Sequence, residues 1–164
     1  METQLLDNLR GKVSDEALAN IHAWLTEPKY ALHKDELVAL IQAGDYKALE
    51  DAFYTVIAFG TGGRRGMTGV GSNRINKITI GESAQALCQY AKKADPDAAT
   101  KGIAIAYDTR LSSKELSRFA AQVCAAAGFK TYLFEDFRAT PELSFAVREL
   151  GAIAGIVISA SHNP

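Results

Sequence analysis

The sequence predicts an α/β fold, in which a mainly parallel sheet of about four strands lies between helices and a helical extension precedes it. Two observations predict this fold. After residue 55, short β-branched apolar runs alternate with stretches of helical periodicity, as in layered α/β domains. Before residue 56, apolar residues recur only at helical spacing. We therefore expect residues 1–55 to form the extension and residues 56–164 the α/β domain. A sheet that mixes parallel and antiparallel strands is the alternative to a parallel one.

Three short helices are expected in the extension. Ser14 can cap the first helix, and Pro28 favours its end. Gly44 ends the second helix, and a third follows it. The apolar residues that share a face are Leu18, Ile21, Trp24 and Leu25 in the first helix, Leu37, Val38, Leu40 and Ile41 in the second, and Leu49, Phe53 and Tyr54 in the third.

The α/β part is expected to alternate strands with three helices. The second helix has Ser112 and Glu115 at capping-box spacing and ends at Gly128. The third has Thr140 as its N-cap and Pro141 at its first helical position. The expected strands are 56–59, 102–107, 130–134 and 153–159, and the first helix covers about 78–93. Inward faces are expected at Leu116, Phe119, Val123 and Ala127 in the second helix and at Leu143, Ala146, Val147 and Leu150 in the third, which Gly151 ends.

Charge and apolar composition exclude several classes of protein. Eighteen Lys and Arg face nineteen Asp and Glu, so the net charge of -1 offers no global attraction for nucleic acid or for an acidic membrane. Residues 1–10 lack the basic start and apolar stretch of a secretory signal, and the longest apolar run is too short to span a bilayer. We expect a cytoplasmic protein. Cys88 and Cys124 fit no metal-ligand spacing, which favours buried free thiols over a redox pair.

Three polar segments follow the ends of expected strands. They are Phe59-Gly-Thr-Gly-Gly-Arg-Arg-Gly66, Tyr107-Asp-Thr-Arg110 and Ser159-Ala-Ser-His-Asn-Pro164. In an open α/β sheet, ligands bind beyond the carboxyl ends of the parallel strands. These segments are therefore the candidates for a functional site.

The glycine-rich segment 59–66 matches neither GxGxxG nor GxxxxGK[ST]. Its glycines leave backbone N–H groups accessible to an anion, and Arg64 and Arg65 add two guanidinium groups that can bind phosphate oxygens. Local composition alone fits a phosphate-binding loop and a solvated turn about equally well.

The serine-containing segment 159–164 does not fit a serine hydrolase. It lacks the GxSxG elbow, and Ser161 and His162 are sequence neighbours, which is poor geometry for a serine–base hydrogen bond. A simple turn is one interpretation. A serine that carries phosphate is the other, and it requires exposure and nearby positive charge.

Segment 159–164 closely resembles the Thr-Ala-Ser-His-Asn-Pro signature of the α-D-phosphohexomutases, the phosphoglucomutase/phosphomannomutase superfamily. The resemblance also covers Phe59 to Asn76, Tyr107-Asp-Thr-Arg110, which is similar to the family's Tyr-Asp-Ser-Arg, and Thr140-Pro-Glu142. The N-terminal helices look like those of the phosphoglucomutase/phosphopentomutase branch.

The resemblance implies a role for each site residue. Ser161 would be the phosphoserine that donates a phosphoryl group to a sugar monophosphate and takes one back from the bisphosphate intermediate. His162 and Asn163 would shape its loop, and Arg65 would stabilise phosphate charge. Magnesium is expected to bind through the phosphate on Ser161. Residues expected to bind phosphate or brace the loops are Thr61, Gly63, Arg64, Asp108 and Arg110, of which Arg64 is expected to face water.

Members of the family continue well beyond the position of Pro164, and their metal-binding and sugar-selecting loops lie downstream. We therefore expect the chain to be the first part of a mutase, with the C-terminal domains of the same enzyme as its partners and a sugar phosphate as its substrate. The isolated chain is expected to be inactive. The alternative is a non-catalytic module that binds phosphate or another protein.

Overall fold

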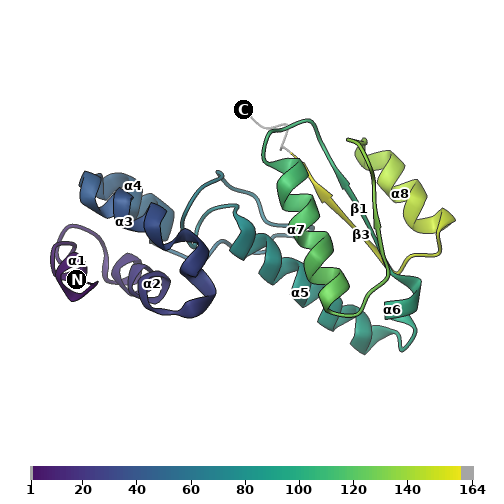
Figure 1. Cartoon of the computed structure of the whole chain (residues 1–164), viewed down its shortest axis with the longest axis horizontal. Helices are drawn as coiled ribbons and strands as arrows, with labels where there is room; N and C mark the ends of the chain where they lie inside the picture. Colours follow the sequence, from purple (N-terminus) through teal and green to yellow (C-terminus); the bar gives the residue numbers. More distant parts are fainter. Residues whose placement is uncertain (1, 160–164) are drawn as a thin grey trace. The chain divides into compact units, whose positions relative to one another are not determined.

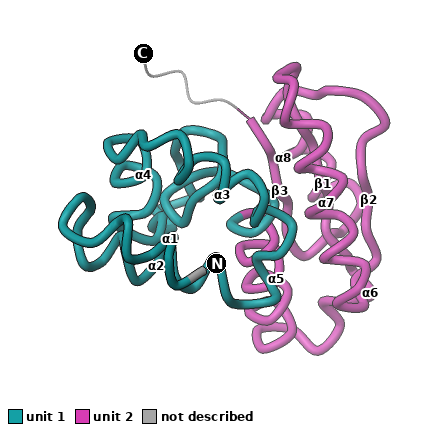
Figure 2. The backbone as a smooth tube through the Cα atoms, turned by 60° about the vertical axis from the view of Figure 1, so that its left-hand side comes forward, with its two compact units in different colours: residues 1–79 teal, residues 80–164 magenta. Residues whose placement is uncertain are grey.

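The structure is a computed structural model that describes residues 2–159, and the chain divides into two compact units, residues 1–79 and 80–164 (Figure 2). The first unit contains α1 (Glu2–Asp7), α2 (Asp15–Thr26), the 3-10 helix η1 (Pro28–His33), α3 (Lys34–Ala43), α4 (Tyr46–Phe53) and the start of α5 (Lys77–Ala94). The second unit contains the rest of α5, α6 (Ala98–Lys101), β1 (Ile103–Tyr107), α7 (Ser113–Ala126), β2 (Thr131–Leu133), α8 (Thr140–Glu149) and β3 (Ala154–Ile158).

The core of the first unit packs aliphatic side chains around the aromatic rings of Trp24, Tyr30 and Phe53. Trp24 stacks on Tyr30 with ring centroids 4.6 Å apart, and Phe53 meets Trp24 edge-on at 5.5 Å. Ser14 caps α2 as expected, because its Oγ accepts the backbone N–H of Ala17 at 3.1 Å. Gly44, with φ of 71°, ends α3 in the left-handed conformation that glycine tolerates. The helices α1 and η1 were not expected from the sequence.

The second unit contains a parallel sheet with the strand order β2-β1-β3. The central strand β1 is fully buried, and its residues alternate between the two faces of the sheet. Ile103 and Ile105 belong to a core formed with α5 and α7, and Ala104 and Ala106 belong to a core formed with Leu143 of α8. Figure 1 shows α7 and α8 on opposite sides of the strands. The predicted layered α/β class with a parallel sheet is confirmed.

The expected strand at residues 56–59 is wrong. The segment lies in the first unit, where the backbone N–H of Ile57 donates to the carbonyl of Ser72 at 2.9 Å. Ile57 is buried, but Val56 and Phe59 are 54% and 62% exposed. The β-branched composition predicted a strand, whereas the tertiary partner of this segment is a loop, and tertiary partners decide β structure. The other three expected strands are confirmed, with each end shifted by at most one residue.

Several expected helix details also need correction. The N-cap of α8 is Ala139, so Thr140 is already the first helical residue. Ser112 precedes α7, but its φ of -81° and ψ of -22° are helical, and its side chain makes no capping hydrogen bond. Leu150 is 44% exposed because it follows the last turn of α8 and leaves the inward face, and Tyr54 after α4 is 48% exposed for the same reason.

Candidate functional site

The expected site residues fall into three groups in the structure. Thr61, Gly63, Arg64 and Arg65 lie in a loop of the first unit, and Asp108 and Arg110 follow β1 in the second unit. Ser161, His162 and Asn163 lie outside the described residues, so their expected roles stay predictions.

The glycine-rich loop of the first unit forms a tight turn. The backbone N–H of Gly60 donates to the carbonyl of Gly63 at 3.0 Å, and Thr61 between them is exposed. The φ angles of Gly60 and Gly63 are not positive, so the turn does not depend on the left-handed conformation. A Cβ added at Gly62 or Gly63 would meet no atom within 4 Å. The loop is therefore open on that side, where an anion could approach its backbone.

The two arginines of the loop have different surroundings. Arg65 is exposed, so its guanidinium is accessible to a ligand. Arg64 is half-buried, and its Nη1 donates to the carbonyl oxygen of Thr79 at 2.7 Å. The expectation that Arg64 faces water is wrong, because a backbone carbonyl in the first turn of α5 accepts its guanidinium.

A buried polar network fixes the chain between this loop and α5. Asn76 and Thr79 form a reciprocal cap: the N–H of Thr79 donates to Asn76 Oδ1 at 3.0 Å, and the N–H of Asn76 donates to Thr79 Oγ1 at 3.1 Å. The Asn76 amide also donates to the carbonyls of Gly69 and Gly71, both at 2.9 Å. Asn76 and Thr79 are 5% and 2% exposed. Buried polar groups that are fully hydrogen-bonded make a segment rigid.

No role for this network was predicted from the sequence. A signal was present, because Asn76 and Thr79 stand three residues apart at the start of a helical pattern, which is capping-box spacing. A further anchor is Arg74, whose Nη2 lies 2.6 Å from Asp51 Oδ2. That ion pair joins the segment to α4.

In the second unit, a turn follows the carboxyl end of β1. The N–H of Asp108 donates to the carbonyl of Ile158 at 3.0 Å, which continues the pairing of β1 with β3 by one residue. Asp108 Oδ1 then accepts the N–H of Arg110 at 3.1 Å, and Arg110 is exposed. The structure therefore brings the Asp108 turn to the end of β3, which leads into segment 159–164, as expected for strands that end at one edge of the sheet.

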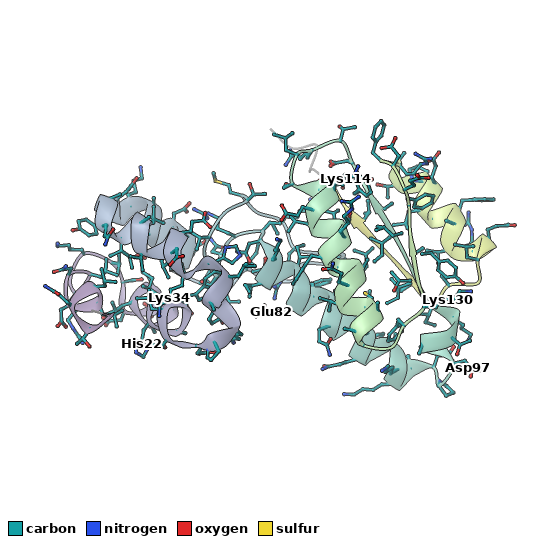
Figure 3. The ribbon with its side chains drawn as sticks, in the orientation of Figure 1. His22, Lys34, Glu82, Asp97, Lys114 and Lys130 are labelled. Carbon is teal, nitrogen blue, oxygen red and sulfur yellow. The ribbon has the colours of Figure 1, made fainter. Side chains whose placement is uncertain are left out.

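Two lysines labelled in Figure 3 lie at opposite ends of the strands, one at their carboxyl ends and one at their amino ends. Lys114 lies in the first turn of α7, at the same edge as the Asp108 turn, and Lys130 lies just before β2 at the opposite edge. Lys114 is exposed and adds a positive charge to the edge where the expected ligand would bind. Lys114 was not predicted from the sequence as a site residue, because its position depends on where α7 begins.

The thiols of Cys88 on α5 and Cys124 on α7 are both free and buried in the core of the second unit. The pKa of Cys124 is raised from its ordinary value of 9.0 to about 12, mainly by burial and also by the neighbouring Cys88. Burial also raises the pKa of Cys88, against a hydrogen bond with Cys124 that lowers it. Both groups are therefore neutral thiols at pH 7, as buried core residues should be.

Within residues 2–159, no group of three or more His, Cys, Asp or Glu side chains is placed to hold a metal ion. Among the same residues, no helix has the length and apolar character needed to cross a membrane.

Residues 56–164 match the family described as phosphoglucomutase/phosphomannomutase, alpha/beta/alpha domain I. The chain belongs to this family. It is 37% identical to a probable phosphoribomutase of Schizosaccharomyces pombe over 144 residues, and 37% identical to a human phosphopentomutase over 147 residues. These alignments cover 88% and 86% of the chain.

A phosphoglucomutase of Staphylococcus haemolyticus is 43% identical over 115 residues, which is 70% of the chain and 20% of that protein. The chain spans 24% of the fission-yeast and human relatives, about a quarter of their length. No solved structure is significantly similar to it.

Proposed function

We propose that the chain is the N-terminal part of a sugar-phosphate mutase, which moves a phosphoryl group between the 1- and the 6- or 5-position of a hexose or pentose phosphate. The observation that carries this proposal is the family match over residues 56–164, which ends on the serine segment. The names of the relatives, phosphopentomutase, phosphoribomutase and phosphoglucomutase, support both hexose and pentose phosphates.

In the proposed reaction, Ser161 carries the phosphoryl group. A hydroxyl of the sugar monophosphate attacks this phosphorus, the bond from phosphorus to Ser161 Oγ breaks, and the hydroxyl proton ends on Ser161 Oγ, which leaves a sugar bisphosphate. Ser161 Oγ then attacks the phosphorus of the other phosphate, the bond from that phosphorus to the sugar oxygen breaks, and the serine proton ends on that oxygen. The serine is phosphorylated again, and the product leaves with one phosphate. Phosphoryl transfer of this kind depends mainly on positioning and on cations near the phosphate oxygens.

The described residues support this reaction through binding and positioning. Arg65 is the exposed guanidinium of the glycine-rich loop, and guanidinium groups bind phosphate oxygens at two points. Thr61 and Gly63 belong to the same turn and offer a hydroxyl and backbone N–H groups. The Asp108–Arg110 turn braces the end of the sheet from which residues 159–164 follow. His162 and Asn163 belong to the Ser161 loop in this proposal.

Mg²⁺ is part of the proposal as a cation that balances phosphate charge. The described residues do not form a cluster that fits it. Its ligands would be the phosphate on Ser161 and groups from the rest of the enzyme, so we assign no step to Mg²⁺ on this chain. The C-terminal domains of the same enzyme are the proposed partners.

A second candidate function is a non-catalytic module that binds phosphate. The observation that favours it is the exposed Arg65 in a loop whose neighbouring Arg64 is hydrogen-bonded to Thr79 of the same unit. This function predicts binding of sugar phosphates by the isolated chain without metal and without turnover.

The proposed function is tested on the complete protein that contains this chain. The protein is incubated with radiolabelled glucose 1,6-bisphosphate, and the labelled residue is mapped by mass spectrometry. We expect label on Ser161 and loss of phosphoryl exchange in Ser161→Ala, while Ser144→Ala, an exposed serine on α8, retains exchange. Exchange that persists in Ser161→Ala would exclude Ser161 as the phosphoryl carrier. Turnover of glucose 1-phosphate by the purified 164-residue chain would contradict the expected inactivity.

A further inference from the structure

Arg64 and Arg65 are neighbours in the glycine-rich loop, but their guanidinium groups have different environments. Arg64 Nη1 donates to the carbonyl of Thr79 at 2.7 Å, and its Nε atom is shielded from solvent. Arg65 is exposed. A hydrogen bond from a charged group to a buried carbonyl is stronger than a neutral one, so it holds the loop in place.

The acceptor of Arg64 is itself rigid. Thr79 is 2% exposed, and its Oγ1 donates to the carbonyl of Arg74 at 2.8 Å while accepting the N–H of Asn76. The Asn76 side chain binds two further carbonyls of the intervening loop. The carbonyl of Thr79 is therefore a fixed point on the first turn of α5. A guanidinium bound to it restrains a loop 15 residues earlier in the chain.

We infer that Arg64 is a positioning residue that fastens the glycine-rich loop to the first turn of α5, so that Arg65 and the Gly60–Gly63 turn face an incoming phosphate group. The fastening stands on contacts within residues 1–79 alone. The role of Arg65 as the phosphate ligand rests on the proposed function. The hydrogen bond from Nη1 to Thr79 and the shielded Nε leave the Arg64 guanidinium less accessible to phosphate than that of the exposed Arg65.

The first measurement uses the unsubstituted 164-residue chain, so it does not depend on whether a variant folds. Arginine Nε–H signals are followed by NMR through hydrogen exchange with solvent. We expect the Arg64 Nε–H to exchange at least about tenfold more slowly than that of Arg65, because Arg64 Nε is shielded from solvent and its guanidinium is held by the Thr79 carbonyl, while the Arg65 side chain is exposed. Equal exchange rates would overturn the inference.

The second measurement compares Arg64→Met with Arg65→Met, which remove the same guanidinium from adjacent positions. Backbone amide exchange of residues 60–66 is measured, and inorganic phosphate is titrated in parallel. We expect Arg64→Met to accelerate loop exchange by about tenfold or more and to weaken phosphate binding partially. Arg65→Met should leave the amide exchange rates of residues 60–66 within about twofold of those in the unsubstituted chain. It should abolish the spectral changes that phosphate causes. Trp24 fluorescence verifies that the first unit is folded in each variant.

The outcomes separate the two roles. If Arg64→Met leaves loop exchange unchanged, or abolishes the phosphate response without loosening the loop, Arg64 is not a positioning residue. If Arg64→Met loosens the loop while phosphate perturbs no residue of the unsubstituted chain, the positioning role holds and the proposed phosphate-binding function of this loop fails.

Discussion

The backbone of Gly71 lies directly against Ala52 at the end of α4, and a Cβ added at Gly71 would be 2.5 Å from the Ala52 carbonyl oxygen. The φ of Gly71 is 137°, a conformation that L side chains rarely adopt. The same carbonyl accepts the N–H of Asn73 at 2.9 Å. This close approach holds the loop that follows the glycine-rich segment against α4.

Gly71→Ala is therefore expected to lower the free energy of unfolding by about 2 kcal/mol or more, because it adds both a clash and backbone strain. Urea unfolding followed by Trp24 fluorescence measures this, since the single tryptophan lies in the core of the first unit. Gly62→Ala is the matched control. Its Cβ would meet nothing within 4 Å and its φ is not positive, so a change of less than about 0.5 kcal/mol is expected. Equal losses in the two variants would contradict this account.

A second prediction concerns the cap of α2. Ser14 Oγ accepts the N–H of Ala17, and the Ser14 N–H donates to Glu50 Oε2 at 2.7 Å. Ser14→Ala removes the acceptor and should cost about 1 kcal/mol in urea unfolding. Ser14→Thr should restore most of that loss.

The control for the capping prediction is Ser112→Ala before α7, followed by circular dichroism at 222 nm. Ser112 makes no capping hydrogen bond, so its removal should cost less than about 0.5 kcal/mol. A loss at Ser112 as large as at Ser14 would show that capping geometry does not decide these effects.

Features that depend on neighbouring residues could be predicted from the sequence, whereas features that depend on tertiary partners could not. The Ser14 cap and the Gly44 stop are confirmed, because they depend on residues within one turn of the helix they bound. The helix α6 was missed, because it has four residues and lacks a periodic pattern. Segment 56–59 has the composition of a strand, but pairing depends on a partner far along the chain, and that partner is the loop at Ser72.

The candidate site shows the same limit. That Arg65 is accessible and that the Asp108 turn follows β1 could be predicted, because both depend on where loops and strand ends fall in the chain. The direction of the Arg64 side chain could not be predicted. Its acceptor is the backbone carbonyl of Thr79, 15 residues away, and because every residue has a backbone carbonyl, the sequence carries no signal for this contact. The role of Ser161 stays a prediction that rests on the family.

A third prediction concerns pH. Burial raises the pKa of Cys124 from 9.0 to about 12 in the folded chain. Between these values the unfolded state loses a proton that the folded state keeps, so the unfolded state binds fewer protons and stability falls as pH rises. The contribution is constant below pH 9 and is lost progressively toward pH 12, by at most about 1.4 kcal/mol for each pH unit.

Urea unfolding followed by circular dichroism from pH 8 to 10.5 measures this slope, and Cys124→Ala is the comparison. The variant loses stability at every pH because it leaves a cavity, but its slope above pH 9 should be shallower. In the unsubstituted chain at pH 8, both thiols should react with a disulfide reagent far more slowly than in urea. Identical slopes in the two proteins would mean that Cys124 is not the responsible group.

The last prediction tests the network beneath the glycine-rich loop. Thr79→Val keeps the shape of the side chain but removes the hydroxyl that accepts the N–H of Asn76 and donates to the carbonyl of Arg74. Leaving these buried groups without that partner should cost about 1–3 kcal/mol in urea unfolding followed by Trp24 fluorescence. The backbone N–H of Asn76 should exchange with solvent at least about tenfold faster than in the unsubstituted chain.

Thr79→Ser is the matched variant, because it keeps the hydroxyl and loses a methyl group. It should lower stability by about 1 kcal/mol through lost apolar contact, yet the Asn76 amide should remain protected as in the unsubstituted chain. Since the backbone carbonyl that accepts Arg64 is present in both variants, faster exchange at residues 60–66 in Thr79→Val alone would mean that the hydroxyl network holds this carbonyl in place. Unchanged protection of Asn76 in Thr79→Val would show instead that the network does not fix the start of α5.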